Sequence, residues 1–218
     1  DTIMHTYIRE PINGLTHLGG AVLSVFGLIA LIMKALETQA SPVELFAVTT
    51  FGISMILLYS ASAAYHSVFA SDRVIAFLRR VDHSMIYLLI AGSYTPFCLI
   101  SLEGSIGKTI FIIVSCMAVL GVFFKLVWFT SPRWLSTALY IIMGWIIIFA
   151  GAPLFSVLSK NGFLLLLWGG IFYTIGGVIY AFKPKWLEFK HFGFHEIFHV
   201  FILLGSLSHF LSVYIYVL

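Results

Sequence analysis

The chain has 218 residues, of which 61% are hydrophobic and only 10% are charged, and its mean hydropathy is +1.04. Soluble domains carry about 25% charged residues, so this composition excludes a soluble protein and indicates one that crosses a membrane several times. The net charge of +3 comes from 12 basic and 9 acidic side chains, too few to suggest nucleic-acid binding. We therefore interpret the basic residues as signals of membrane topology.

Neither the cysteines nor the N-terminal residues indicate a secreted, disulfide-stabilised protein. Cys98 and Cys116 both lie within apolar runs, so we do not expect a disulfide framework, and two cysteines are too few for a cysteine-based zinc cluster. Residues 1–17 are polar and show no cleavable signal pattern.

Seven apolar runs are long enough to cross a bilayer, which takes about 20 helical residues. The connections between them are short and contain helix breakers such as Ser41-Pro42 and Glu103-Gly104. We therefore predict an all-α membrane protein with a single domain, residues 1–218, built as a bundle of seven transmembrane helices. The predicted helices are Thr16–Leu36, Val43–Phe69, Val81–Ser101, Lys108–Phe129, Trp134–Leu158, Gly162–Phe182 and Gly193–Leu218.

The distribution of Lys and Arg over alternate connections predicts the orientation in the membrane. The predicted N-terminal side carries nine of these residues: Arg9, Arg73, Arg79, Arg80, Lys125, Arg133, Lys183, Lys185 and Lys190. The opposite side carries three: Lys34, Lys108 and Lys160. Because basic loops are retained in the cytoplasm, we predict a multi-pass plasma-membrane protein with its N-terminus in the cytoplasm and its C-terminus outside.

Two prolines lie inside predicted helices, Pro96 in the third and Pro153 in the fifth. Proline removes a backbone hydrogen bond and usually bends a membrane helix, so we expect a kink at each. We interpret both as packing kinks rather than as hinges of a gate.

The last apolar run begins with two histidines four residues apart, His195 and His199, with Glu196 between them. In an α-helix these histidines lie one turn apart, about 6 Å along the axis, so both rings can face one point. Ionisable side chains inside a membrane segment are costly and usually mark a functional site. This pair therefore predicts half of a metal site.

Further polar residues are predicted at the same membrane depth. Ser62 and His66 share a helix face at the end of the second run, and Asp82 opens the third. His66, His195 and His199 would form the three-nitrogen set of catalytic zinc, which leaves a fourth position for water. Imidazole suits zinc, whereas Mg²⁺ and Ca²⁺ prefer oxygen. Asp82 and Ser62 would orient and deprotonate that water.

Simpler interpretations of these residues stay open. A lone buried histidine is more often a hydrogen-bonded core residue than a ligand. Asp82 could pair with Arg79 or Arg80, and Ser62 could be a helix-packing hydroxyl. Glu196 lies about 80° or more from the midline of the histidine pair, so a structural role fits it at least as well as catalysis.

Three other histidines carry weaker signals. His17 could be a reserve ligand or a partner at the mouth of the site, although we expect a polar residue at a helix start. His83 faces away from the neighbouring carboxylate. His209 lies about 21 Å beyond His195 along the helix and cannot reach the same ion. It marks a polar path toward the outer side or bonds a hydroxyl such as that of Ser206.

Four short motifs resemble the bacterial hemolysin III family, which is related to the progesterone and adiponectin receptors. They are Glu10, Asn13, Thr16 and His17; Ser62 and His66; Asp82 with Gly92-Ser93-Tyr94-Thr95-Pro96; and His195 with His199. The resemblance runs from Glu10 to the last predicted helix.

This resemblance implies a seven-helix bundle with its N-terminus inside. It also implies that His66, His195 and His199 match the zinc ligands of the receptor branch, and that Ser62 and Asp82 match its water-contacting residues. That branch is associated with hydrolysis of lipid amides such as ceramide, and the bacterial branch takes its name from reported lysis of red cells. The His-Glu-x-x-His string is also the zincin protease pattern. The receptors need only the two histidines, so the match gives Glu196 no catalytic role.

Three functions follow as hypotheses. The first is a zinc-dependent membrane hydrolase of lipid amides or esters, with zinc as cofactor, membrane lipids as partners and Asp82 as proton shuttle. The second is a membrane-active or pore-forming protein with a structural zinc, although the helices show no row of charges to line a channel. The third is a sensor of membrane state that binds metal without turnover. The substrate and the oligomeric state stay open.

Overall fold

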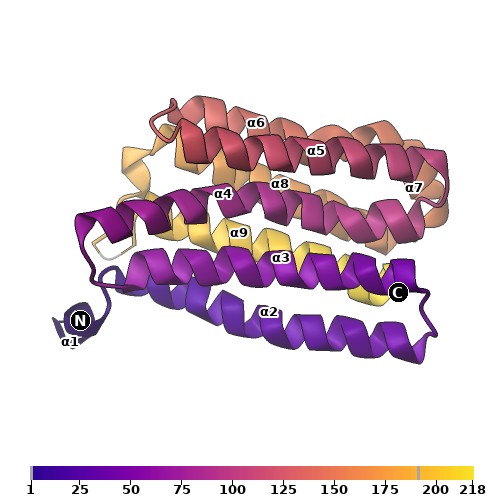
Figure 1. The fold of residues 1–218 in the computed structure, drawn as a ribbon, viewed down its shortest axis with the longest axis horizontal. Coiled ribbons are helices and arrows are strands. Elements are labelled where there is room, and N and C mark those ends of the chain that lie inside the picture. The colour runs from indigo at the N-terminus through magenta and orange to yellow at the C-terminus, as the bar shows by residue number, and fades with distance from the viewer. Residues whose placement is uncertain (1, 191) are drawn as a thin grey trace.

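The computed structural model describes residues 2–190 and 192–218 and contains helices but no strand over those ranges. The prediction of seven spans is confirmed, since seven helical segments are long and apolar enough to cross a membrane (Figure 1). A short helix, α1 (Thr2–Tyr7), precedes them, and a 3₁₀ turn, η3 (Lys185–Leu187), lies in the last connection. The spans are α2 (Pro11–Glu37), α3 (Pro42–Ser67), α4 (Asp72–Pro96) continued by η1 (Phe97–Ser101), α5 (Ser105–Val127), α6 (Arg133–Trp145) continued by η2 (Ile146–Ala150) and α7 (Gly151–Val157), α8 (Lys160–Phe182), and α9 (Phe194–Leu211) continued by η4 (Ser212–Val217).

The helices follow one another around the bundle in chain order. Helix α2 packs on α3, α3 on α4 and α4 on α5, while α6 packs on α8 and α8 on α9. Helix α9 returns to contact α2, which closes the bundle and brings the first span beside the last. The termini lie at opposite ends, as an odd number of spans requires.

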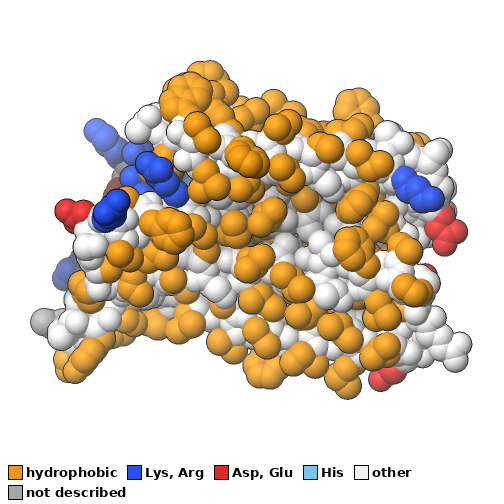
Figure 2. All heavy atoms as spheres, viewed as in Figure 1, with side chains coloured by type: hydrophobic (Ala, Val, Ile, Leu, Met, Phe, Trp, Pro, Cys, Tyr) orange, Lys and Arg blue, Asp and Glu red, His pale blue; other side chains and the backbone are white. Residues whose placement is uncertain are grey.

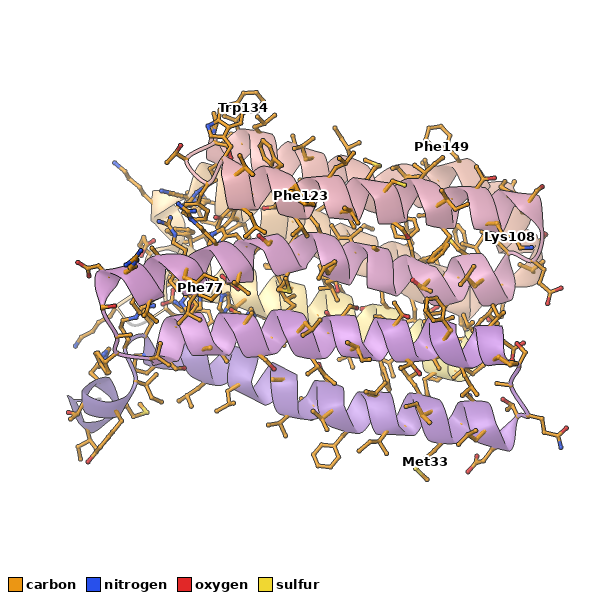
Figure 3. The ribbon with its side chains drawn as sticks, viewed as in Figure 1. Met33, Phe77, Lys108, Phe123, Trp134 and Phe149 are labelled. Carbon is orange, nitrogen blue, oxygen red and sulfur yellow. The ribbon has the colours of Figure 1, made fainter. Side chains whose placement is uncertain are left out.

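The outer surface is apolar along the middle of the bundle and charged at its ends (Figure 2). Large side chains such as Met33, Phe123 and Phe149 project outward from the helices (Figure 3). A surface of this kind suits hydrocarbon, because each helix satisfies its own backbone hydrogen bonds and presents apolar side chains to lipid. Most Lys and Arg side chains gather at the end that carries the N-terminus, whereas Lys108 lies at the other.

Two spans begin five or more residues earlier than we predicted. Helix α4 begins at Asp72 rather than Val81, and α2 begins at Pro11 rather than Thr16. We placed the starts where the apolar runs begin, but caps determine where a helix starts. Ser71 caps α4 with its hydroxyl, and proline is favoured in the first turn because the N–H it lacks has no helical partner there.

The two interior prolines change the helix type around them. After Pro96 the span continues through the π-helical η1 segment, whose turns are wider than those of an α-helix. Before Pro153 the span passes through the 3₁₀ segment η2, and α7 then starts afresh at Gly151. Pro153 therefore lies in the first turn of a new helix, where a missing N–H leaves no hydrogen bond broken.

The Tyr94 side chain of α4 satisfies backbone hydrogen-bonding groups where α6 ends. Its hydroxyl accepts a hydrogen bond from the Ile147 N–H at 2.9 Å and donates one to the Met143 carbonyl at 2.7 Å. In a regular helix these two backbone groups would bond to each other, so the hydroxyl is inserted between them. Irregular backbone is tolerated inside a membrane where another protein group satisfies it.

We expect Gly121→Val to destabilise the bundle, because any Cβ at this position in α5 would collide with the Tyr87 ring of α4. Overpacking of this kind costs about 1–3 kcal/mol. Thermal unfolding of the detergent-solubilised protein should show a lower midpoint. Gly19→Val is the matched control, since no atom lies within 4 Å of a Cβ there. Equal midpoints for the two variants would contradict the close α4–α5 packing.

Candidate metal site

Three imidazoles from two helices meet at the N-terminal end of the bundle. His66 lies in the last turn of α3, and His195 and His199 lie in the first turns of α9. His66 and His199 are buried, with 2% and 1% of their surface exposed. Over the described ranges, His66, His195 and His199 form the group of metal-ligating side chains close enough to share an ion, with ligand atoms within 4.8 Å of one another.

The spacing of the ring nitrogens fits a metal ion. The Nε2 atoms of His66 and His195 lie 3.3 Å apart. Two ligands at about 2.0–2.1 Å from a tetrahedral zinc would lie about 3.4 Å apart. The His199 ligand atom lies within 4.8 Å of both. The three residues can therefore hold a metal ion.

Glu10, just before α2, orients the His66 ring. His66 Nδ1–H donates to Glu10 Oε2 at 3.1 Å, which leaves the Nε2 lone pair free for a metal. Arg9 in turn donates to Glu10 Oε1 at 2.7 Å. Burial of the Glu10 carboxyl raises its pKa, but the interaction with His66 and the charge of Arg9 outweigh this and lower it to about 2. The carboxyl is therefore ionised at neutral pH.

Thr16 orients the His199 ring in the same way. The Thr16 hydroxyl donates to the Ile12 carbonyl at 2.7 Å, so it accepts from His199 Nδ1–H at 3.4 Å. This fixes the same tautomer as in His66 and leaves the Nε2 lone pair free.

His17 belongs to the site, and our expectation of a polar residue at a helix start is wrong. Because α2 begins at Pro11, His17 lies in its second turn and faces inward, only 3% exposed. Its ring stacks on that of His199 with centroids 3.5 Å apart, and its Nδ1 lies 2.6 Å from the Ser62 hydroxyl.

Glu196 has a structural role, one of the two interpretations the sequence allowed. Its Oε2 accepts from the Gly193 N–H at 2.9 Å, which caps the start of α9. Its Oε1 accepts from Asn13 Nδ2 at 3.3 Å, and the same amide nitrogen lies 3.3 Å from Glu10 Oε2. Asn13 therefore links the start of α2 to the start of α9.

The inward face of α2 is the part of the site that sequence reasoning missed. Glu10, Asn13, Thr16 and His17 are spaced by three, three and one residues, which places them on one helix face. This spacing could have indicated that they surround the histidines, but we used the motif only for its family resemblance.

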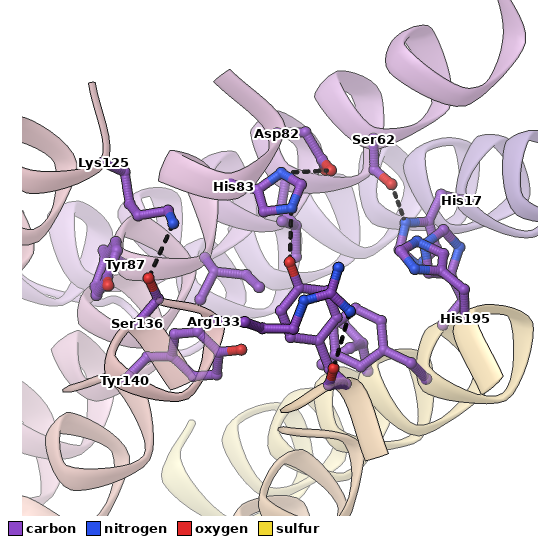
Figure 4. A pocket seen from close by; sticks show the side chains of 16 residues that line it. His17, Ser62, Asp82, His83, Tyr87, Lys125, Arg133, Ser136, Tyr140 and His195 are labelled. Carbon is purple, nitrogen blue, oxygen red and sulfur yellow. Dashed lines mark hydrogen bonds and ion pairs between the residues drawn. The ribbon is translucent and has the colours of Figure 1, made fainter. Parts of the chain in front are cut away.

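Asp82 and Ser62 face a small cavity beside the imidazoles. The cavity, of about 40 Å³, is also lined by His195 and His199 (Figure 4). Asp82 Oδ2 lies 3.6 Å from His83 Nδ1, but that N–H donates to the Arg79 carbonyl at 2.8 Å. The described residues show no ion pair between Asp82 and either neighbouring arginine, so the carboxylate is available to the cavity.

Comparison with known proteins places the chain in a family. The family model described as Haemolysin-III related matches residues 5–210. The chain belongs to the haemolysin III family. It is 42% identical over 218 residues to Hemolysin-3 of Bacillus cereus, covering all of this chain and 96% of that protein. It is 40% identical over 213 residues to the Hemolysin-3 homolog of Bacillus subtilis (strain 168), with 98% and 96% covered.

A plant protein is a more distant relative of this haemolysin III chain. Heptahelical transmembrane protein 1 of Arabidopsis thaliana is 27% identical over 185 residues, which cover 76% of the present chain and 54% of the plant protein. Its name, heptahelical, matches the seven spans described above.

His209 lies in α9 outside the group of three imidazoles. Its Nε2–H donates to the Leu166 carbonyl at 3.0 Å, and its Nδ1 is buried without a partner within the described residues. The Ser206 hydroxyl instead bonds Tyr59 and Tyr173, at 2.6 and 2.7 Å, so our alternative of a His209–Ser206 bond is wrong.

We expect the wild-type protein, purified and exposed to zinc, to hold about one metal ion per chain, and His66→Ala and His199→Ala to hold almost none. Each substitution removes one of three nitrogen ligands. Elemental analysis of the desalted protein measures the ratio. His5→Ala, in the exposed α1 helix, is the control and should bind as the wild type does. Unchanged metal content in both site variants would rule out this site.

Glu10→Ala should weaken metal affinity about 10- to 100-fold, because the His66 ring loses the carboxylate that fixes its tautomer. Competition with a chromogenic chelator measures the affinity. Glu103→Ala, which removes an exposed carboxylate in the connection between η1 and α5, should leave it unchanged. Equal affinities for both variants would show that Glu10 does not support the ligand.

Proposed function

We propose that this haemolysin III protein is a zinc-dependent membrane hydrolase that cleaves an amide or ester bond of a lipid. The observation that carries this proposal is the common cavity: Asp82 and Ser62 line the same space as His195 and His199. A metal group used only for stability would need neither a carboxylate nor a hydroxyl facing an open space beside it.

The donor set favours zinc over harder cations. Three neutral imidazole nitrogens suit zinc, whereas Mg²⁺ and Ca²⁺ take mainly oxygen ligands. His66, His195 and His199 would hold the ion. When bound, zinc supplies a Lewis acid that polarises a carbonyl and makes water a better nucleophile near neutral pH.

The side chains around the cavity then have distinct tasks. Asp82 accepts the proton of the attacking water and returns it to the departing amine or alcohol. Ser62 orients the water, and its own hydroxyl is fixed by His17 at 2.6 Å. Glu10 and Thr16 hold the two imidazoles that they contact in one tautomer.

Two further cavities support a substrate with an acyl chain. A cavity of about 60 Å³ adjoins the metal-side cavity, and a third of about 220 Å³ adjoins the second. Three residues line both the metal-side cavity and the 60 Å³ cavity, namely Ile86, Tyr140 and Ile202. The row runs along α9 from His199 toward His209, about 15 Å further along the helix. An extended hydrocarbon chain suits such mainly apolar spaces.

We further propose that the protein lies in the plasma membrane with its N-terminus and metal site on the cytoplasmic side. The gathering of Lys and Arg at the end that carries the N-terminus supports this orientation (Figure 2).

The names of the two Bacillus relatives support a second candidate, lysis of membranes. In that case the metal would be structural, and the Asp82 carboxylate would be dispensable. A sensor that binds metal without turnover is the third candidate. Only the hydrolase forms a chemical product, and only the hydrolase needs the Asp82 carboxylate to form it.

We expect Asp82→Asn to lower hydrolysis at least about 100-fold while it retains the metal, because an amide has the shape of the carboxylate but cannot accept the proton. Zinc-loaded protein is incubated with a panel of lipid amides and esters, and free fatty acid is measured by mass spectrometry. Asp72→Asn, exposed in the first turn of α4, is the control. A wild type that is inert across the panel, yet releases dye from liposomes as well as Asp82→Asn does, would favour lysis.

A further inference from the structure

Lys125 of α5 has an unusual environment for a basic residue near the membrane surface. Such lysines normally extend their charge toward the head groups and water. Lys125 is instead only 6% exposed, and its Nζ donates to the Ser136 hydroxyl at 2.9 Å on the wall of the metal-side cavity (Figure 4). The same ammonium lies over the Phe129 ring, 5.3 Å from its centroid, so its three N–H donors meet one neutral oxygen acceptor and one aromatic face within the described residues.

Arg133, at the start of α6, lines the same cavity. Its guanidinium packs over the Tyr180 ring at 4.4 Å and donates from Nη1 to the Tyr180 carbonyl at 3.1 Å. These contacts use one of five N–H donors and hold the planar group in place. A fixed guanidinium with spare donors is suited to a phosphate or carboxylate.

Neither cation is neutralised by an acidic side chain in residues 2–190 and 192–218. The ion pairs there involve Arg9, His66 and His83 as the basic partners. Lys125 is buried and Arg133 is half-buried, and a buried charge without an acidic partner is costly, so a cavity lined by both cations favours an anionic occupant.

The position of the two cations indicates which anion binds between them. They lie on α5 and α6 at the membrane end that carries the basic residues, and the imidazoles and Asp82 line the same cavity from α9 and α4. We propose that Lys125 and Arg133 form an anion site that binds the phosphate of a lipid head group. This rests on the proposed function and narrows its substrate class to anionic phospholipids, because the bound phosphate would hold the acyl linkage near the imidazoles.

A binding experiment tests this without relying on turnover. The zinc-loaded protein in neutral detergent is titrated with ether-linked phosphatidic acid and with the matching ether-linked diglyceride, and native mass spectrometry gives both affinities. Neither lipid has an amide or a carboxylic ester bond, so the proposed hydrolase cannot release a fatty acid from either. The wild type should prefer the phosphatidic acid about ten-fold or more, and Lys125→Met and Arg133→Gln should each lower that preference about ten-fold. Lys125→Arg should keep it.

Lys185→Met and Arg73→Gln, which remove exposed charges predicted on the same side, are the controls and should keep the preference. An equal loss in these controls would show a general surface effect and overturn the proposal. So would a wild type without preference, or a preference retained in both Lys125→Met and Arg133→Gln. Inorganic phosphate that binds as tightly as the lipid would assign the site to the free anion instead. Lipid preference without any hydrolysis would defeat the proposed function alone.

Discussion

The cost of placing imidazoles inside a membrane protein governs the arrangement of this bundle. A buried ring nitrogen without a partner or a metal is costly. The outward nitrogens of His66 and His199 are satisfied by Glu10 and Thr16, both on or just before α2. The first span, α2, must therefore lie against both the second span, α3, and the last span, α9. Its contact with α9 closes the ring of helices. The metal group and the closure of the bundle depend on the same contacts.

Irregular backbone is concentrated around the apolar cavities rather than around the imidazoles. The break between α6 and α7 is bridged by Tyr94, whose side chain also lines the two cavities beyond the metal site. Regular helices α3 and α9 carry the three histidines, so their ring positions are held by continuous hydrogen-bonded turns. Regular helices thus hold the three histidines, and the irregular backbone between α6 and α7 lines the apolar cavities beside them.

The sequence predicted the seven spans and the meeting of His66, His195 and His199, because both depend on apolar length and helical period. It failed on His17, because the apolar run begins at Thr16 whereas α2 begins at Pro11, with proline in its first turn. It also could not place the Lys125 side chain. Lys125 adds to the count of basic residues on its side of the membrane whether its side chain points to lipid or to a cavity. The direction in which a long side chain points is decided by tertiary packing, and the sequence pattern does not show it.

The charge balance of the metal-side cavity bears on its turnover. A bound metal, Lys125 and Arg133 would place positive charge around Asp82, the one carboxylate among the described residues lining that cavity. Such a field attracts an anionic lipid, but it also holds a released fatty acid, which is itself an anion. Product release would then limit the rate, and a hydrolase that retains its product resembles a sensor of membrane lipids. The two hypotheses still differ in chemistry, because a sensor without turnover forms no fatty acid whose release could be slow.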